Sequence, residues 1–174
     1  MAERIKLAIE LIPKTCHYIN ARQKLKPAQW NAVRKYIYHK ANYRCEICGL
    51  TGKQQGFRVN LECHEAWLFK NSTHTQKLVG LVALCPLCHQ TKHFGRSSMM
   101  GRQPQVFKQL ENVNNWTHKE AVQHVAESVI ECKERAKYYW KLDLSILLKP
   151  PFNVKLKTKK KKYTYKKQSK RRMN

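Results

Sequence analysis

The fold of this chain is decided by two stretches, Cys45-Glu46-Ile47-Cys48-Gly49 and Cys85-Pro86-Leu87-Cys88. Each contains two cysteines separated by two residues, a spacing that turns both thiolates toward one point. Two such pairs supply four sulfurs in a tetrahedral array, the closed coordination of a structural zinc ion. We therefore predict that these four cysteines bind Zn²⁺ and that binding is coupled to folding. The alternatives are two unrelated thiol pairs, or a redox pair at the start of a helix in a β-α-β pattern, which this sequence lacks.

Regular elements are expected around these pairs. Apolar residues three and four positions apart predict a helix over residues 27–41, which leads into the first pair. Alternation over residues 57–62 predicts a strand with Cys63 toward the core and His64 on its open, solvent-facing side. We also expect a polar loop at 71–77, an apolar run at 78–84, a short helix ended by Gly95, and helices over 103–113 and from Thr117 to about Trp140. The apolar residues expected to face inward on the last helix are Val122, Val125, Val129, Ile130, Ala136 and Tyr139.

The chain as a whole is expected to be a small α+β protein in which a zinc-stapled core carries flanking helices. Residues 1–26 form an N-terminal arm, with a helix over 2–12 that Pro13 stops. Residues 27–148 form the folded domain. Residues 149–174 form a basic tail with too few apolar side chains to fold by itself, so we expect this tail to be disordered.

The charge of the chain is extreme. Lys and Arg number 35 against 11 Asp and Glu, which gives a formal net charge of +24. Residues 149–174 contain 12 of the basic residues and no acidic one, so the remainder of the chain is also basic. A field of this sign favours polyanions, nucleic acid first and anionic membrane second, with solubility as the alternative explanation. We predict nucleic acid as the partner, DNA more than RNA, and leave a protein partner open.

Basic residues in the tail are expected to contact phosphates, and the interleaved Tyr163 and Tyr165 can stack on bases. The predicted contact residues are Lys157, Lys159, Lys160, Lys161, Lys162, Lys166, Lys167, Lys170, Arg171 and Arg172. A nuclear address or a solvated tail are the other interpretations. Neither a membrane-spanning stretch nor a signal peptide is expected, and paired cysteines followed by His favour a reducing compartment. We therefore expect a cytoplasmic protein, or a nuclear one if the host is eukaryotic.

A second group of polar residues surrounds the cysteines. His64 and Glu65 lie between the two pairs, and His89 and His93 follow the second pair. Because His89 and His93 are four residues apart, they share one face of a helix. Three imidazoles and a carboxylate could hold a second metal ion with positions left for water and phosphate. The alternative is that His64 makes an ordinary strand hydrogen bond and that His89 or His93 joins the sulfur site.

Together these residues resemble a known family. The order of a helix, C-E-I-C-G, a strand ending in L-E-C-H-E, and L-V-A-L-C-P-L-C-H-Q-T-K-H is similar to the HNH, or ββα-metal, nucleases built on a treble-clef zinc scaffold. The match covers residues 42–95, and a looser one to bacterial and phage HNH-endonuclease-like proteins covers 9–144. The resemblance implies a divalent ion such as Mg²⁺, Mn²⁺, Ni²⁺ or Zn²⁺, and a His that activates water to attack a DNA phosphodiester.

The resemblance also implies roles for single residues. His89 matches a metal ligand, and His93 matches the additional ligand of a subgroup with two helical histidines. If His64 takes the first slot at the strand end, it is a ligand and Glu65 occupies the slot of the general base. If Cys63 takes that slot, His64 is the base. Gly80 stands where the family has an Asn that holds the base.

An HNH-like endonuclease with His64, Glu65 and His89 as catalytic residues is therefore the expected function. The alternatives are a non-catalytic treble-clef module that binds DNA or RNA, and a protein-interaction scaffold.

Overall fold

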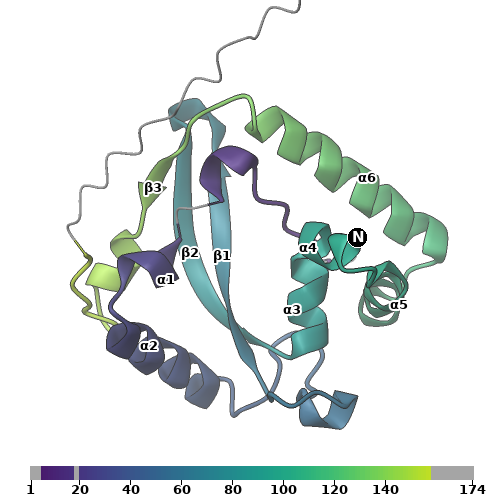
Figure 1. Ribbon diagram of the computed structural model, residues 1–174, viewed down its shortest axis with the longest axis horizontal. Helices are drawn as coiled ribbons and strands as arrows, with labels where there is room; N and C mark the ends of the chain where they lie inside the picture. The colour runs from purple at the N-terminus through teal and green to yellow at the C-terminus, as the bar shows by residue number, and fades with distance from the viewer. Residues whose placement is uncertain (1–4, 18–19, 158–174) are drawn as a thin grey trace, which may run out of the picture.

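The computed structural model describes residues 5–17 and 20–157, which form an α+β fold (Figure 1). Its strands form one sheet in the order β1-β2-β3, with β1 antiparallel and β3 parallel to β2. The strands and α-helices are α1 (Ala21–Lys24), α2 (Pro27–Lys40), β1 (Glu62–Lys70), β2 (Thr75–Leu84), α3 (Pro86–Lys92), α4 (Phe94–Met99), α5 (Gln103–Asn114), α6 (His118–Arg135) and β3 (Lys141–Asp143). Short 3₁₀ turns lie at Lys14–Cys16, Lys53–Gln55, Asn71–Thr73 and Ser145–Leu148. The predicted α+β class is confirmed.

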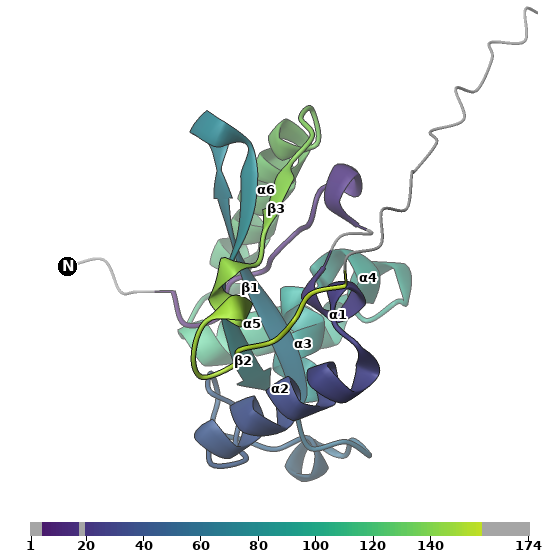
Figure 2. The same cartoon turned by 90° about the vertical axis from the view of Figure 1, so that its left-hand side faces the viewer.

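The hairpin of β1 and β2 organises the molecule. Its strands pair from Glu62 opposite Leu84 to Lys70 opposite Thr75, with a bulge after Ala66. In Figure 1 this hairpin runs through the middle, with α2 on one side and α3 to α6 on the other. Figure 2 shows β3 and the end of α6 beside the tip of the hairpin. The hairpin therefore reaches from the tip, beside β3, to the start of α3.

Two apolar clusters stabilise this arrangement. The first joins the end of β2 to α4 and α5 through Leu84, Phe94 and Leu110, which are at most 7% exposed. The second joins β2 to α2 through Leu78 and Val33. Burying each such side chain contributes about 1.5–3 kcal/mol before entropy is counted. Because both clusters include residues of β2, the hairpin is held from both sides.

The predicted helix over residues 2–12 is wrong over its described part. Residues 5–13 run without helical structure, and Leu7 is fully buried in the first cluster. The backbone groups that a helix would pair internally are bonded by distant side chains: the Asn114 amide oxygen accepts from the N–H of Leu7, and its nitrogen donates to the Leu7 carbonyl. The arm is thus part of the core rather than an appendage.

Other elements also differ from their predicted bounds. The second strand begins at Thr75, inside the predicted loop, and Gly95 lies within α4 instead of ending a helix. The strand predicted at 57–62 lies at Glu62–Lys70, because residues 57–60 are tied back into a turn in which Phe57 and Gly52 hydrogen-bond. Helix α6 begins at the predicted capping box but ends at Arg135, where the Trp140 indole donates to the Arg135 carbonyl. Its inward face also differs: Ala121 is buried, whereas Val122 and Ile130 are exposed. The helices predicted over 27–41 and 103–113 are confirmed as α2 and α5.

Structured chain continues beyond residue 148, the end predicted for the folded domain. The N–H of Val154 donates to the Leu147 carbonyl, and that of Lys157 donates to the Lys24 carbonyl. Phe152 packs against both apolar clusters. Residues 149–157 therefore contain enough apolar side chains to pack on α1 and α2. The disorder predicted for the tail beyond residue 157 concerns residues outside the described ones. Among the described helices, none combines the length and the apolar character that crossing a membrane requires.

Candidate metal centres

The four predicted sulfurs converge. Cys45 and Cys48 lie in the turn after α2, where Gly49 adopts a φ of 74° that favours glycine. Cys85 is the N-cap of α3, and its sulfur accepts from the N–H of Cys88 at 3.4 Å. The four Sγ atoms lie within 4.8 Å of one another, and those of Cys48 and Cys85 are 3.6 Å apart. This cluster could hold a metal ion such as zinc, as predicted.

Neighbouring elements hold this four-sulfur centre in place. The Glu46 carboxylate accepts from the Ala83 N–H at 2.7 Å, and the Ala83 carbonyl accepts from the Glu46 N–H, so the first turn is fixed to β2. From α5, the Gln109 side chain donates to the Cys88 sulfur at 3.1 Å. Hydrogen bonds from the other three thiols hold the pKa of Cys45 below its usual range. Four sulfurs that converge in a largely buried site offer a ligand set that suits a divalent cation such as zinc.

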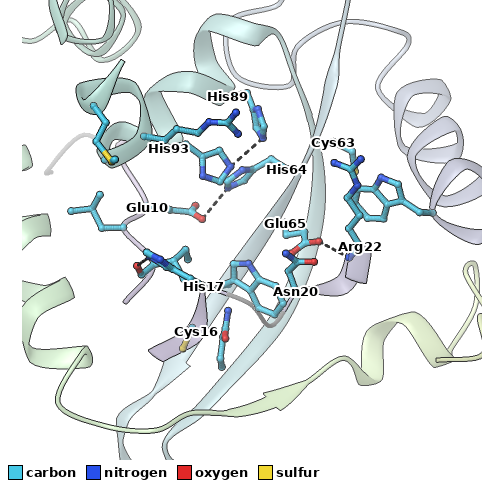
Figure 3. Close-up of a pocket in the computed structure, with 18 residues that line it drawn as sticks. Glu10, Cys16, His17, Asn20, Arg22, Cys63, His64, Glu65, His89 and His93 are labelled. Carbon is cyan, nitrogen blue, oxygen red and sulfur yellow. Dashed lines mark hydrogen bonds and ion pairs between the residues drawn. The ribbon is translucent and has the colours of Figure 1, made fainter. Parts of the chain in front are cut away.

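A second group is formed by His64 of β1, His89 of α3 and His93 at the C-terminal end of α3 (Figure 3). One nitrogen from each ring lies within 4.8 Å of the others, and the Nε2 atoms of His89 and His93 are 3.2 Å apart. The predicted convergence of the three imidazoles is confirmed. This three-histidine centre is separate from the four sulfurs, so none of its members joins that cluster.

The expected exposure of His64 is wrong. Its side chain is only 3% exposed, because the N-terminal arm covers it and brings the Glu10 carboxylate to 3.0 Å from its Nε2. Its Nδ1 is buried without a hydrogen-bond partner among the described residues. The alternation of the strand could not reveal which distant segment packs over this side chain.

The electrostatics of the rings suit metal binding. Burial lowers the pKa of His64, and burial together with the charges of His89 and His64 lowers the pKa of His93 to about 3. Both rings are therefore neutral at pH 7 and can offer a lone pair. The Nδ1 of His89 donates to the Glu62 carboxylate at 2.8 Å, which orients its Nε2 toward the other rings. A carboxylate behind an imidazole is the usual outer-shell partner of a metal-ligating His.

Two carboxylates contact the imidazoles, and neither is the predicted Glu65. Glu62 bonds His89, and Glu10 bonds both His64 and, at 2.7 Å, the Lys92 ammonium. Burial raises the pKa of Glu10, but the bonds and charges of His64 and Lys92 outweigh it and lower the pKa to about 2. The sequence signal for Glu10 is an acidic residue inside an apolar segment of a strongly basic chain.

The three-histidine centre borders a cavity of about 620 Å³. Its lining includes His64, His89, His93, Glu10, Glu65, Arg22, Arg96, Trp30 and Trp67. The Glu65 carboxylate accepts from the backbone N–H of Arg22 at 3.0 Å, and burial raises its pKa (Figure 3). Glu65 therefore faces the same space as the imidazoles without bonding to them. A phosphate group entering this space would meet imidazoles, cationic side chains and a carboxylate.

Most of the residues predicted to contact phosphate lie outside the residues that the structure describes. Of these ten residues only Lys157 is described; it is exposed, with its Nζ 3.5 Å from the Gln23 carbonyl. The other nine, from Lys159 to Arg172, lie outside the described residues.

Comparison of the chain with protein-family models, with curated proteins and with solved structures gave no match.

Proposed function

We propose that this protein is a metal-dependent endonuclease of the HNH, or ββα-metal, type that hydrolyses phosphodiester bonds in DNA. The observation that carries this proposal is the convergence of His64, His89 and His93 beside a cavity of about 620 Å³. Imidazoles at ligand spacing are suited to a divalent ion, and an open cavity leaves room for a substrate phosphate.

The scaffold supports the same interpretation. A C-x-x-C turn, the β1–β2 hairpin, and a helix capped by the second C-x-x-C pair follow one another in the order of a treble clef. In this proposal zinc at the four-sulfur centre staples the first turn to the start of α3. Because the ligating His64 lies on the hairpin and His89 lies on that helix, the staple fixes the two elements that must meet.

The described residues take distinct roles in the proposed hydrolysis. A divalent ion held by the three imidazoles would stabilise negative charge on the phosphate oxygens. With His64 as a ligand, Glu65 takes the slot of the general base, and a raised pKa improves a carboxylate as a proton acceptor. Arg22 and Arg96 line the same cavity and can neutralise phosphate charge. The net charge of +24 supports binding to DNA before any specific contact forms.

A second candidate is a non-catalytic module that binds nucleic acid. Two observations favour it: Gly80 stands in place of the Asn expected by the resemblance, and Glu10 already contacts the His64 nitrogen. Such a module would keep the four-sulfur staple and the positive charge and would have lost the reaction.

Incubation with supercoiled plasmid and single divalent cations (Mg²⁺, Mn²⁺, Ni²⁺ or Zn²⁺) separates these functions. The endonuclease proposal predicts nicked and linear products that disappear in His64→Ala and His93→Ala, while both variants keep zinc and bind DNA. His39→Ala, an exposed histidine of α2, is the matched control and should cleave like the natural protein. Retention of DNA without cleavage under every cation would favour the binding module.

A further inference from the structure

We propose that the cavity beside the three-histidine centre receives one unpaired nucleobase, so that the DNA that is cut is single-stranded or locally unpaired at the scissile phosphate. This inference rests on the proposed function and adds to it the class of DNA substrate. The cavity measures about 620 Å³, a size that suits a single small organic group. A duplex, whose bases are paired and stacked between two backbones, cannot enter a space of this size.

The cavity has two chemically different sides. It lies along β1, an edge strand of the sheet, and elements from both sides of the hairpin contribute to its wall (Figure 1). Helices α3 and α4 contribute His89, His93 and Arg96, whereas α1 and α2 contribute Arg22 and Trp30. The side of α3 and α4 therefore offers groups for a metal-bound phosphate, and the side of α1 and α2 offers an aromatic ring for a base.

Strand β1 sets the distance between these two sides. Trp67 follows His64 by three residues, which corresponds to about 10 Å along an extended strand. Both side chains line the cavity. A nucleotide whose phosphate lies at the imidazoles can therefore place its base, which is on the far side of the sugar, beside Trp67.

Two of the four tryptophans, Trp30 and Trp67, differ from the other two. Trp116 packs against an imidazole and Trp140 against a phenyl ring, with ring centroids 5.2 Å and 4.8 Å apart. Within residues 5–17 and 20–157, neither Trp30 nor Trp67 makes such a ring contact. Both are partly buried against the second apolar cluster, which holds them in place, and both line the cavity. They are thus anchored aromatic surfaces on which a base can stack.

Polar side chains that can read the edge of a base line the same cavity. Gln76 of β2 is only 2% exposed, and Asn20 is the N-cap of α1. Amide groups both donate and accept hydrogen bonds, as the edges of bases do. Figure 3 shows Asn20 and Arg22 apart from the helical imidazoles, with His64 and Glu65 between them. Stacking surfaces combined with hydrogen-bonding side chains are what proteins use to hold a base taken out of the stack.

The test is a titration with oligo(dT), without added divalent cation, that follows the intrinsic fluorescence of tryptophan. Thymine quenches this fluorescence when it stacks on an indole. Trp30→Phe and Trp67→Phe each remove one fluorophore of the cavity and keep a ring, and Trp67→Leu removes the ring as well. Trp116→Phe is the matched control, because Trp116 does not line the cavity. Zinc content and circular dichroism verify that each variant is folded.

We expect oligo(dT) to quench the natural protein. The quenched fraction should fall in Trp30→Phe and Trp67→Phe and should not fall in Trp116→Phe. Trp67→Leu should bind oligo(dT) about tenfold more weakly than Trp67→Phe, because the stacking surface is lost. An equal quenched fraction in the three Phe variants would overturn the inference.

A cleavage experiment separates this inference from the proposed function. A duplex oligonucleotide is compared, under each of the four cations, with the same duplex carrying a central unpaired bubble. We expect cleavage in the bubble to be about tenfold faster or more, because its bases need no unstacking. Equal rates would overturn the inference and leave the endonuclease in place. Absence of cleavage in both DNAs, with quenching reduced only in the cavity variants, would overturn the endonuclease and support the binding of a base.

Discussion

The four-sulfur and three-histidine centres share helix α3, but they are assembled in different ways. Cys85 and Cys88 stand at the start of α3, and His89 and His93 at and beyond its middle. Each cysteine pair is closed by a local turn. The imidazoles instead meet only because β1, α3 and the arm pack together, and they border a cavity. In the proposed function, the first centre would determine stability and the second would determine chemistry.

The largest expected effect comes from breaking the four-sulfur centre. Cys85→Ser should remove the zinc and unfold the hairpin-helix unit, because zinc at such sites contributes about 10–16 kcal/mol of apparent binding free energy to folding. Metal analysis and circular dichroism give the result. Cys132→Ser, a cysteine outside both centres, should leave metal content and fold unchanged. A zinc-free Cys85→Ser protein that keeps its fold would contradict the stapling role.

An outer-shell change at the four-sulfur centre should act on that centre alone. Gln109→Leu removes the hydrogen bond to the Cys88 sulfur and should weaken zinc binding by about 10–100-fold. Zinc affinity is measured by chelator competition, and Co²⁺ affinity at the imidazoles in parallel. An equal loss at both centres would show that they are not independent.

The reciprocal change is Glu62→Ala, which removes the carboxylate behind His89. We expect Co²⁺ affinity at the three-histidine centre to fall by about 10–100-fold, with zinc at the cysteines unaffected. Glu62→Gln keeps an acceptor for the His89 N–H and should recover part of the loss. If Glu62→Ala binds Co²⁺ like the natural protein, His89 does not need this partner to act as a ligand.

The smallest expected effect is a pH dependence of the arm. Burial lowers the pKa of His124, whose ring accepts from the Ile9 N–H only when neutral. A lowered pKa in the folded state means that the associated stability is present above the ordinary value of about 6.5 and is lost as pH falls below it. His124→Gln keeps an acceptor that does not titrate, so the acid side of its thermal-unfolding profile should be flatter than that of the natural protein. Superimposable profiles would assign the acid sensitivity to other groups.

Local spacing explains what could be predicted from the sequence. The cysteine pairs, α2, α5 and the i, i+4 pair of His89 and His93 depend on residues a few positions apart, and all were found. Glu10 could not be assigned, because its contact with His64 spans 54 residues and requires the arm to leave the helical state expected for it. The parallel strand β3 was not predicted for a different reason, because three residues carry no periodic signal.

Anomalous diffraction from crystals of zinc-loaded protein soaked with Co²⁺ tests the central claim most directly, because it locates each ion among its ligands. The account predicts two peaks, one among the four sulfurs and one among His64, His89 and His93. A single peak at the sulfurs, with no ion among the three imidazoles, would contradict it.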